Sequence, residues 1–169
     1  AYFFGASMAT DAFVTAFRIP NLLRDMFAEG ALSQAFIPIF KEKMVNGSEK
    51  DAFKVADIVF TALLLVVGFI VLLGIIAAPV LIFMFVNGFG ETPEKFDLTV
   101  ELTRIMMAYL LLVSLSAIVM GMLNSFGKFG IPALSPALFN LGIIITVVGF
   151  HSFFEQPIYS LAIGVLVGG

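Results

Sequence analysis

The run from Ile58 to Val86 contains no charged side chain, and it constrains the fold more than any other feature of the sequence. A helix of about 20 apolar residues is long enough to cross a bilayer, so this run can span a membrane with length to spare. Pro79, near its end, is expected to bend the helix because proline has no backbone N–H to donate. We therefore predict a transmembrane helix over residues 55–86.

The composition extends this prediction to the whole chain. Of its 169 residues, 60% are hydrophobic and 12% are charged, whereas soluble domains contain roughly 45–50% apolar and 25% charged residues. We predict an all-α, polytopic membrane protein with about four full transmembrane helices and the start of another, in a single transmembrane domain over residues 1–169. Because the sequence lacks an initial Met and stops within an apolar run, we expect it to be a fragment. The helices are predicted at residues 8–40 (kinked), 55–86, 98–126, 131–150 and 158–169, the last one cut short.

The lysines predict an orientation. Residues 41–54 contain four of them and residues 127–130 contain Lys128, whereas the connections 87–97 and 151–157 contain only Lys95. Cytoplasmic loops of membrane proteins are enriched in Lys and Arg, so the first two connections are predicted to be cytoplasmic. Glu101 and Arg104, at i and i+3 near the start of the third helix, are expected to pair with each other at the membrane edge.

Several chemistries lack their usual residues. The chain has no cysteine and one histidine, so it offers no disulfide and no thiolate or clustered-histidine metal site. It also lacks a glycine-rich phosphate loop, an HExxH motif and a GxSxG nucleophile motif. We therefore expect no enzymatic activity, no catalytic residue, no cofactor, no metal and no nucleic-acid partner.

The stretch TDAFVTAFRIPNLLRDMFAEG, residues 10–30, is the exception to the apolar pattern. On an ideal helix, five polar residues of this stretch fall within about 40° of one line: Asp11, Thr15, Arg18, Asp25 and Glu29. Each charge at the centre of a bilayer costs roughly 2.5–3.5 kcal/mol on insertion scales, so such a stripe is expected to face a polar cavity. Pro20 and Gly30 are expected to let the helix bend.

Two interpretations of the stripe remain open at this point. In the first, the charges only pair internally, Arg18 with Asp11 or Asp25, and Arg24 with a neighbour on another helix. In the second, Arg24 is the centre of a cationic site for an anionic substrate group, because a guanidinium can bind a phosphate with two parallel hydrogen bonds.

Two strings carry a resemblance to a known family. FGASMATDAFVTAFRIPNLLRDMFAEGALSQAFIPIF and LNSFGKFGIPALSPALFN resemble the MurJ/MviN family of lipid II flippases, within the multidrug/oligosaccharidyl-lipid/polysaccharide exporter superfamily. The resemblance implies a two-lobe transporter of about fourteen helices, of which this chain would be helices two to five and the start of six. It also implies a substrate-binding role for Arg24 in PNLLR, followed by Asn21, Asp11, Glu29 and Arg18. Many relatives have a second basic residue where this sequence has Asp25.

The function that the resemblance implies is translocation of lipid II across the bacterial cytoplasmic (inner) membrane by alternating access, as a multi-pass protein. The implied partners are lipid II itself (the undecaprenyl-diphosphate-linked disaccharide-pentapeptide), membrane lipids and the rest of the same transporter chain. Two alternatives stay open. One is an ion-coupled multidrug or polysaccharide-lipid exporter with Asp11 or Glu29 as its coupling acid, and the other is a non-transporting membrane scaffold.

The orientation is tested by labelling single cysteines in the intact protein. Ser48→Cys should not react with a membrane-impermeant thiol reagent added outside the cell, whereas a cysteine placed within residues 87–97 should. Labelling of Ser48→Cys from outside would reverse the predicted topology.

Overall fold

The computed structural model describes the chain except for residues 1–4, 6, 28–30 and 86–91. The part of the chain that it describes contains six α-helices, one 3-10 turn (η2) and no strand, so the predicted all-α fold is confirmed. The helices are α1 (Met8–Phe27), α2 (Ala31–Asn46), α3 (Glu49–Phe85), α4 (Pro93–Ser125), α5 (Gly130–Phe150) and α6 (Ile158–Gly168), with η2 (His151–Phe153) between the last two.

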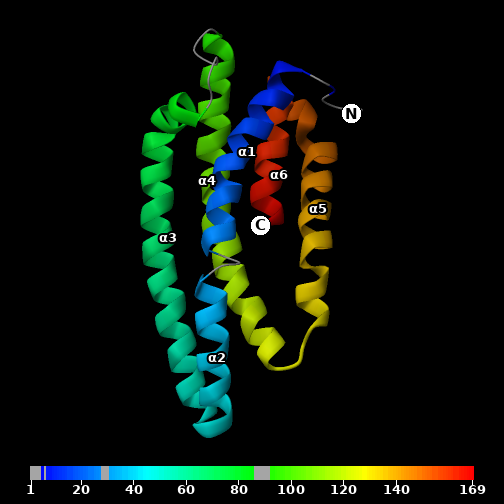
Figure 1. Ribbon diagram of the computed structural model, residues 1–169. Helices are drawn as coiled ribbons and strands as arrows, with labels where there is room; N and C mark the ends of the chain where they lie inside the picture. Colours follow the sequence, from blue (N-terminus) through cyan, green and yellow to red (C-terminus); the bar gives the residue numbers. More distant parts are fainter. Residues whose placement is uncertain (1–4, 6, 28–30, 86–91) are drawn as a thin grey trace.

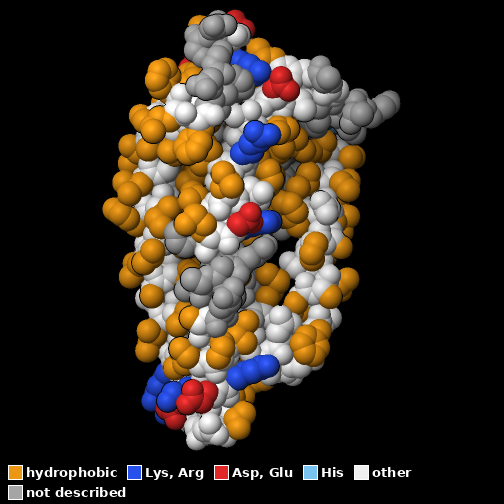
Figure 2. Space-filling model, in the orientation of Figure 1, with side chains coloured by type: hydrophobic (Ala, Val, Ile, Leu, Met, Phe, Trp, Pro, Cys, Tyr) orange, Lys and Arg blue, Asp and Glu red, His pale blue; other side chains and the backbone are white. Residues whose placement is uncertain are grey.

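Three of these helices are long and apolar enough to cross a membrane: α3, α4 and α5 with the following 3-10 turn. Helix α3 keeps many large apolar side chains on its surface; Leu65, Ile76 and Phe83, for example, are 67%, 74% and 73% exposed. Figure 2 shows hydrophobic side chains over the middle of one face of the molecule, and charged side chains gathered at the end where α2 meets α3. This distribution suits a protein whose middle lies in lipid.

Helix α4 is the centre of the bundle and packs against α1, α2, α3, α5 and α6. In Figure 1, α1 and α2 follow each other down one side, α3 returns along the full length, and α4, α5 and α6 alternate in direction. The α2–α3 and α4–α5 connections therefore lie at one end of the bundle, and the α3–α4 and α5–α6 connections lie at the other. Residues 41–54 and 127–130, the two connections predicted to be cytoplasmic, therefore lie at the same end of the bundle.

The helix boundaries differ from the predicted ones at polar positions. The predicted kinked helix over 8–40 is described as α1 and α2, and Gly30 lies outside the described residues. Residues 41–54, predicted as a polar connection, are helical on both sides of a short break at Gly47 and Ser48. Ser48 caps α3, because its hydroxyl accepts a hydrogen bond from the backbone N–H of Asp51 at 3.2 Å and donates one to the Asp51 carboxylate at 2.7 Å. Helix α4 likewise begins earlier than predicted, with Pro93 at a first-turn position that tolerates proline.

Small residues bring α5 and α6 into close contact. A Cβ atom added to Gly142 would lie 2.8 Å from the Cα of Gly168, and one added to Gly164 would lie 3.0 Å from the Cα of Ile143. Such distances leave no room for a side chain, so the two backbones pack directly on each other. This is the usual way in which apolar helices associate within a bilayer.

Gly142→Val should destabilise the packing of α5 on α6 by about 1–3 kcal/mol, because the new side chain meets backbone atoms that cannot move aside alone. Gly149→Val is the matched control, because a Cβ at Gly149 meets nothing within 4 Å. Thermal unfolding of the purified intact protein in detergent measures both. Equal losses of stability in the two variants would contradict the packing described here.

Candidate functional site

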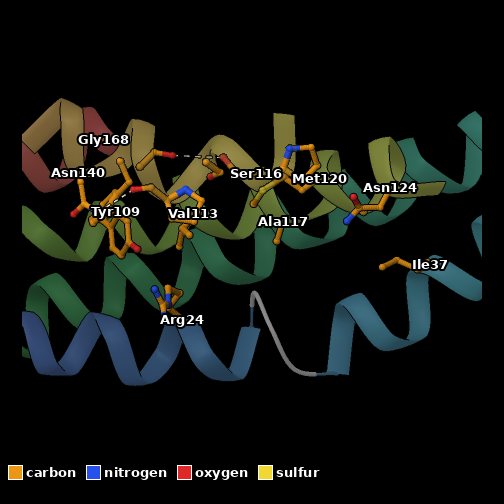
Figure 3. A pocket seen from close by; sticks show the side chains of 16 residues that line it. Arg24, Ile37, Tyr109, Val113, Ser116, Ala117, Met120, Asn124, Asn140 and Gly168 are labelled. Atoms are coloured by element: carbon orange, nitrogen blue, oxygen red, sulfur yellow. Dashed lines mark hydrogen bonds between the residues drawn. The ribbon is translucent and has the colours of Figure 1, made fainter. Parts of the chain in front are cut away.

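A cavity of about 750 Å³ lies between α4 and α5, closed at one end by the last residues of α6. Figure 3 shows it from close by, with Arg24 reaching in from α1 and Ile37 from α2. Most of its wall belongs to α4 and α5. The described residues that line it are Arg24, Ile37, Tyr109, Val113, Ser116, Ala117, Met120, Gly121, Asn124, Pro132, Ser135, Pro136, Phe139, Asn140, Gly168 and Gly169.

The path of the chain explains why the cavity exists. Helix α6 packs against both α4 and α5 near the end of the bundle where α5 stops. Toward the other end, α4 and α5 continue to the tight connection that joins them, where Gly127 has a φ of +72° that an L side chain rarely adopts. No helix of the described chain fills the space between α4 and α5 there, and the cavity occupies it.

Arg24 is the charged member among the described residues that line the cavity. Its side chain is 29% exposed, and its Nη2 and Nε atoms donate to the Oδ1 atom of Asp25 at 2.9 and 3.2 Å. Asp25 is more exposed, at 53%. Arg24 and Asp25, which are neighbours in the sequence, thus form an ion pair at the cavity wall. Arg24 is the member of the pair that lines the cavity.

The wall contributed by α4 and α5 is polar but neutral. It contains the hydroxyl groups of Ser116 and Ser135 and the amide groups of Asn124 and Asn140, among apolar side chains such as Val113 and Phe139. Asn140 donates to the carbonyl oxygen of Pro136 at 3.0 Å, and its own carbonyl oxygen can accept. The sequence analysis did not single out these residues, because their spacing is unremarkable until α4 and α5 are placed side by side.

The other predicted site residues occupy different places. Asp11 is exposed at the start of α1, and its Oδ2 atom lies 3.3 Å from the Nζ atom of Lys95 in the first turn of α4. Arg18 is exposed and Asn21 is half-buried, and neither lines the cavity. Glu29 lies outside the described residues. Asp11 and Arg24 are thirteen residues apart on one helix, or about 20 Å, so the stripe extends well beyond the cavity.

The ion pairs differ from those that the sequence suggested. Asp11 pairs with Lys95 and Asp25 pairs with Arg24, whereas Arg18 was expected to pair with one or the other of these two acids. Glu101 and Arg104 do not bond to each other as predicted. Glu101 accepts a hydrogen bond from the hydroxyl group of Tyr159 in α6, and Arg104 donates from Nε to the backbone carbonyl of Ile75 in α3 at 3.2 Å. Helices on either side of α4 offer these partners, so the two side chains diverge.

Comparisons with known proteins agree with one another. A model of the family described as "Lipid II flippase MurJ" matches residues 1–169. The probable lipid II flippase MurJ of Buchnera aphidicola subsp. Schizaphis graminum is 44% identical over 100% of this chain and 33% of its own length. The lipid II flippase MurJ of Burkholderia cenocepacia is 41% identical over 98% of this chain and 32% of its own length.

A solved structure shares the fold. The "Lipid II flippase MurJ, inward closed conformation" superposes with a TM-score of 0.76 at 30% sequence identity, over 98% of this chain and 35% of that chain. The chain thus spans about a third of the length of the proteins that it matches.

The ion pair between Asp11 and Lys95 should tie the start of α1 to the start of α4. Because Asp11 is 70% exposed, the coupling between Asp11→Asn and Lys95→Gln in a double-mutant cycle should be small, about 0.2–1 kcal/mol. Thermal unfolding of the intact protein measures it. The same Lys95→Gln change combined with Asp57→Asn, on another helix, is the control and should be additive. Additivity of Asp11→Asn with Lys95→Gln would mean that the pair contributes nothing to stability.

Proposed function

The chain belongs to the lipid II flippase MurJ family, and from this we propose that it forms part of a transporter that moves lipid II across the bacterial cytoplasmic membrane. The family consists of transporters, and the apolar helices make the chain a multi-pass membrane protein. The observation that carries the proposal for this chain's own residues is a single arginine in a cavity inside an all-helical membrane fold.

Arg24 is proposed to bind the diphosphate of the lipid-linked precursor. Its guanidinium is planar and stays charged, and it matches the geometry of phosphate oxygens better than an ammonium does. The partly buried position weakens competition from water, so a charged hydrogen bond formed there is stronger than one on an open surface. Asp25 holds the guanidinium through two nitrogen atoms in the structure, and an incoming phosphate would compete with this carboxylate for them.

The neutral wall of the cavity is proposed to contact the uncharged, hydroxyl- and amide-bearing part of the same substrate. The Ser116 and Ser135 hydroxyls and the Asn124 and Asn140 amides can both donate and accept hydrogen bonds. A saccharide presents the same mixture of donors and acceptors without charge. One cation on one wall and neutral polar groups on the other would suit a ligand that joins a diphosphate to a sugar.

The remaining candidates are assigned supporting roles in this proposal. Asp11 anchors α1 to α4 through Lys95, while Arg18, Asn21 and Glu29 contact the substrate or the rest of the transporter at other stages of alternating access. Proline residues within α1 and α5, Pro20 and Pro136, are places where these helices can bend during the change between inward and outward openings.

Depletion of the intact protein separates this function from the alternatives. Accumulation of the lipid-linked precursor in the inner leaflet is the expected result. Sensitivity to drugs without such accumulation would indicate an ion-coupled exporter instead, and neither effect would indicate a scaffold.

Arg24→Ala in the intact protein should abolish complementation of a depletion strain while the protein still accumulates. Arg24→Lys should be impaired as well, because a point charge loses one of two parallel hydrogen bonds, each worth roughly 1.5–3 kcal/mol when charged. Asp25→Asn should be tolerated or improve function, because it removes the carboxylate that competes with the substrate. Growth, with immunoblots for protein level, measures all three.

Lys128→Ala, which removes an exposed cation outside the cavity, is the control and should complement fully. If the Arg24–Asp25 pair is only structural, Arg24→Ala should instead lower the protein level, and adding Asp25→Asn should restore it. Full growth with Arg24→Ala at normal abundance would remove Arg24 from the substrate site.

A further inference from the structure

Pro79 leaves one backbone carbonyl of α3 without its ordinary partner, and α3 changes direction near its end (Figure 1). In an α-helix the carbonyl of residue i accepts from the N–H of residue i+4, and for Ile75 that residue is Pro79, which has no N–H. Ile75 lies in the most apolar part of the chain, far from either polar end of α3. Water is scarce at this depth of a bilayer, so an unsatisfied carbonyl there costs several kcal/mol.

Arg104 of α4 reaches this carbonyl. Its Nε atom donates to the oxygen of Ile75 at 3.2 Å, across the contact between α3 and α4. A charged side chain in a transmembrane helix is itself costly unless it faces water or a polar partner. The Ile75 carbonyl, which lacks a backbone donor because of Pro79, therefore accepts from Arg104, and the guanidinium of Arg104 gains a polar partner.

The two helices are packed tightly on both sides of this bond. At Gly74, the residue before Ile75, the Met107 side chain of α4 lies against the backbone of α3, one turn along α4 from Arg104. Around Pro79 a small buried cluster joins Ala78 and Ile82 of α3 to Val100 of α4, and Ile19 of α1 packs against it. The last part of α3 is thus in contact with α1 at Ile19, five residues before Arg24.

We propose that Arg104 is a positioning residue that replaces the hydrogen bond missing at Pro79 and thereby fixes the direction in which the last part of α3 leaves the bend. The proposal concerns the geometry of α3, α4 and α1 and does not depend on what the cavity binds. It predicts that Arg104 matters only while residue 79 is a proline, because any other residue there restores a backbone donor to the Ile75 carbonyl.

The test is a double-mutant cycle read by distances between spin labels in the intact protein, with any other cysteine removed. Cysteines replace Phe83, beyond the bend, and Leu112 on α4; both side chains are exposed. Arg104→Ala should broaden and shift the distance distribution between these two labels. In the Pro79→Ala background the same change should leave the distribution as it is in Pro79→Ala alone. Arg104→Lys, which keeps a donor and the charge, should give an intermediate distribution.

A second pair of labels is the matched control. Leu65, on α3 before the bend, is exposed and is labelled together with the same Leu112. Its distance distribution should be unchanged by Arg104→Ala, because the proposed effect is confined to the part of α3 beyond Pro79. If Arg104→Ala changed both distance distributions, the bundle would have loosened as a whole, and the proposal would be overturned.

Thermal unfolding gives an independent readout of the same cycle. Arg104→Ala should lower the unfolding midpoint by roughly 2–4 °C, and by clearly less when residue 79 is alanine. Equal shifts in the two backgrounds would overturn the proposal. If Arg104→Ala does not accumulate, recovery of the protein by the added Pro79→Ala supports the proposal, and failure of the double variant to accumulate counts against it.

Discussion

The absence of water from the bilayer interior is the constraint on which the rest of this structure depends. Every backbone and charged group placed there needs a partner from the protein itself. The backbone meets this demand as helix, and Arg104 meets it by donating to the carbonyl of Ile75. Two further side-chain pairs join helices, Asp11 with Lys95 at the starts of α1 and α4, and Tyr159 with Glu101. All three connect α4 to a different helix, which explains why α4 is the centre of the bundle.

The cavity is different, because a charged side chain lines an open space there. Arg24, the charged residue among the described residues that line it, forms an ion pair with the neighbouring Asp25 on the same helix. This pair lies within α1, so opening it does not by itself separate two helices. α1 and α4 are held together elsewhere, by apolar packing of Ala12 and Ala16 against Leu102 and by the ion pair of Asp11 with Lys95. Under the proposed function, ligand contact at Arg24 is thus separate from the contact of α1 with α4 near Asp11.

The sequence was sufficient for the fold class because composition and charge-free length are averages over many residues. The helix boundaries depend instead on single side chains. The Ser48 hydroxyl caps the start of α3 within a stretch that is polar on average and was predicted to be a connection. The candidate site was less predictable. Arg24 stood out as a charge in an apolar chain, but Asn124 and Asn140 are ordinary residues until the fold brings their helices together. Lys95 and Asp11 lie 84 positions apart, and only tertiary structure pairs them.

The pairing of Arg24 with Asp25 also has an electrical consequence. Moving one elementary charge across the membrane potential involves about 2.3 kcal/mol per 100 mV. A guanidinium and a carboxylate that move together carry no net charge, so the potential performs no work on them when the cavity is empty. If a doubly charged diphosphate joins the pair, as the proposed function requires, the site becomes anionic, and its displacement then couples directly to the voltage. Asp25 thus sets the charge of the empty pair to zero, so that under the proposed function the electric field would act on the pair only in its loaded form.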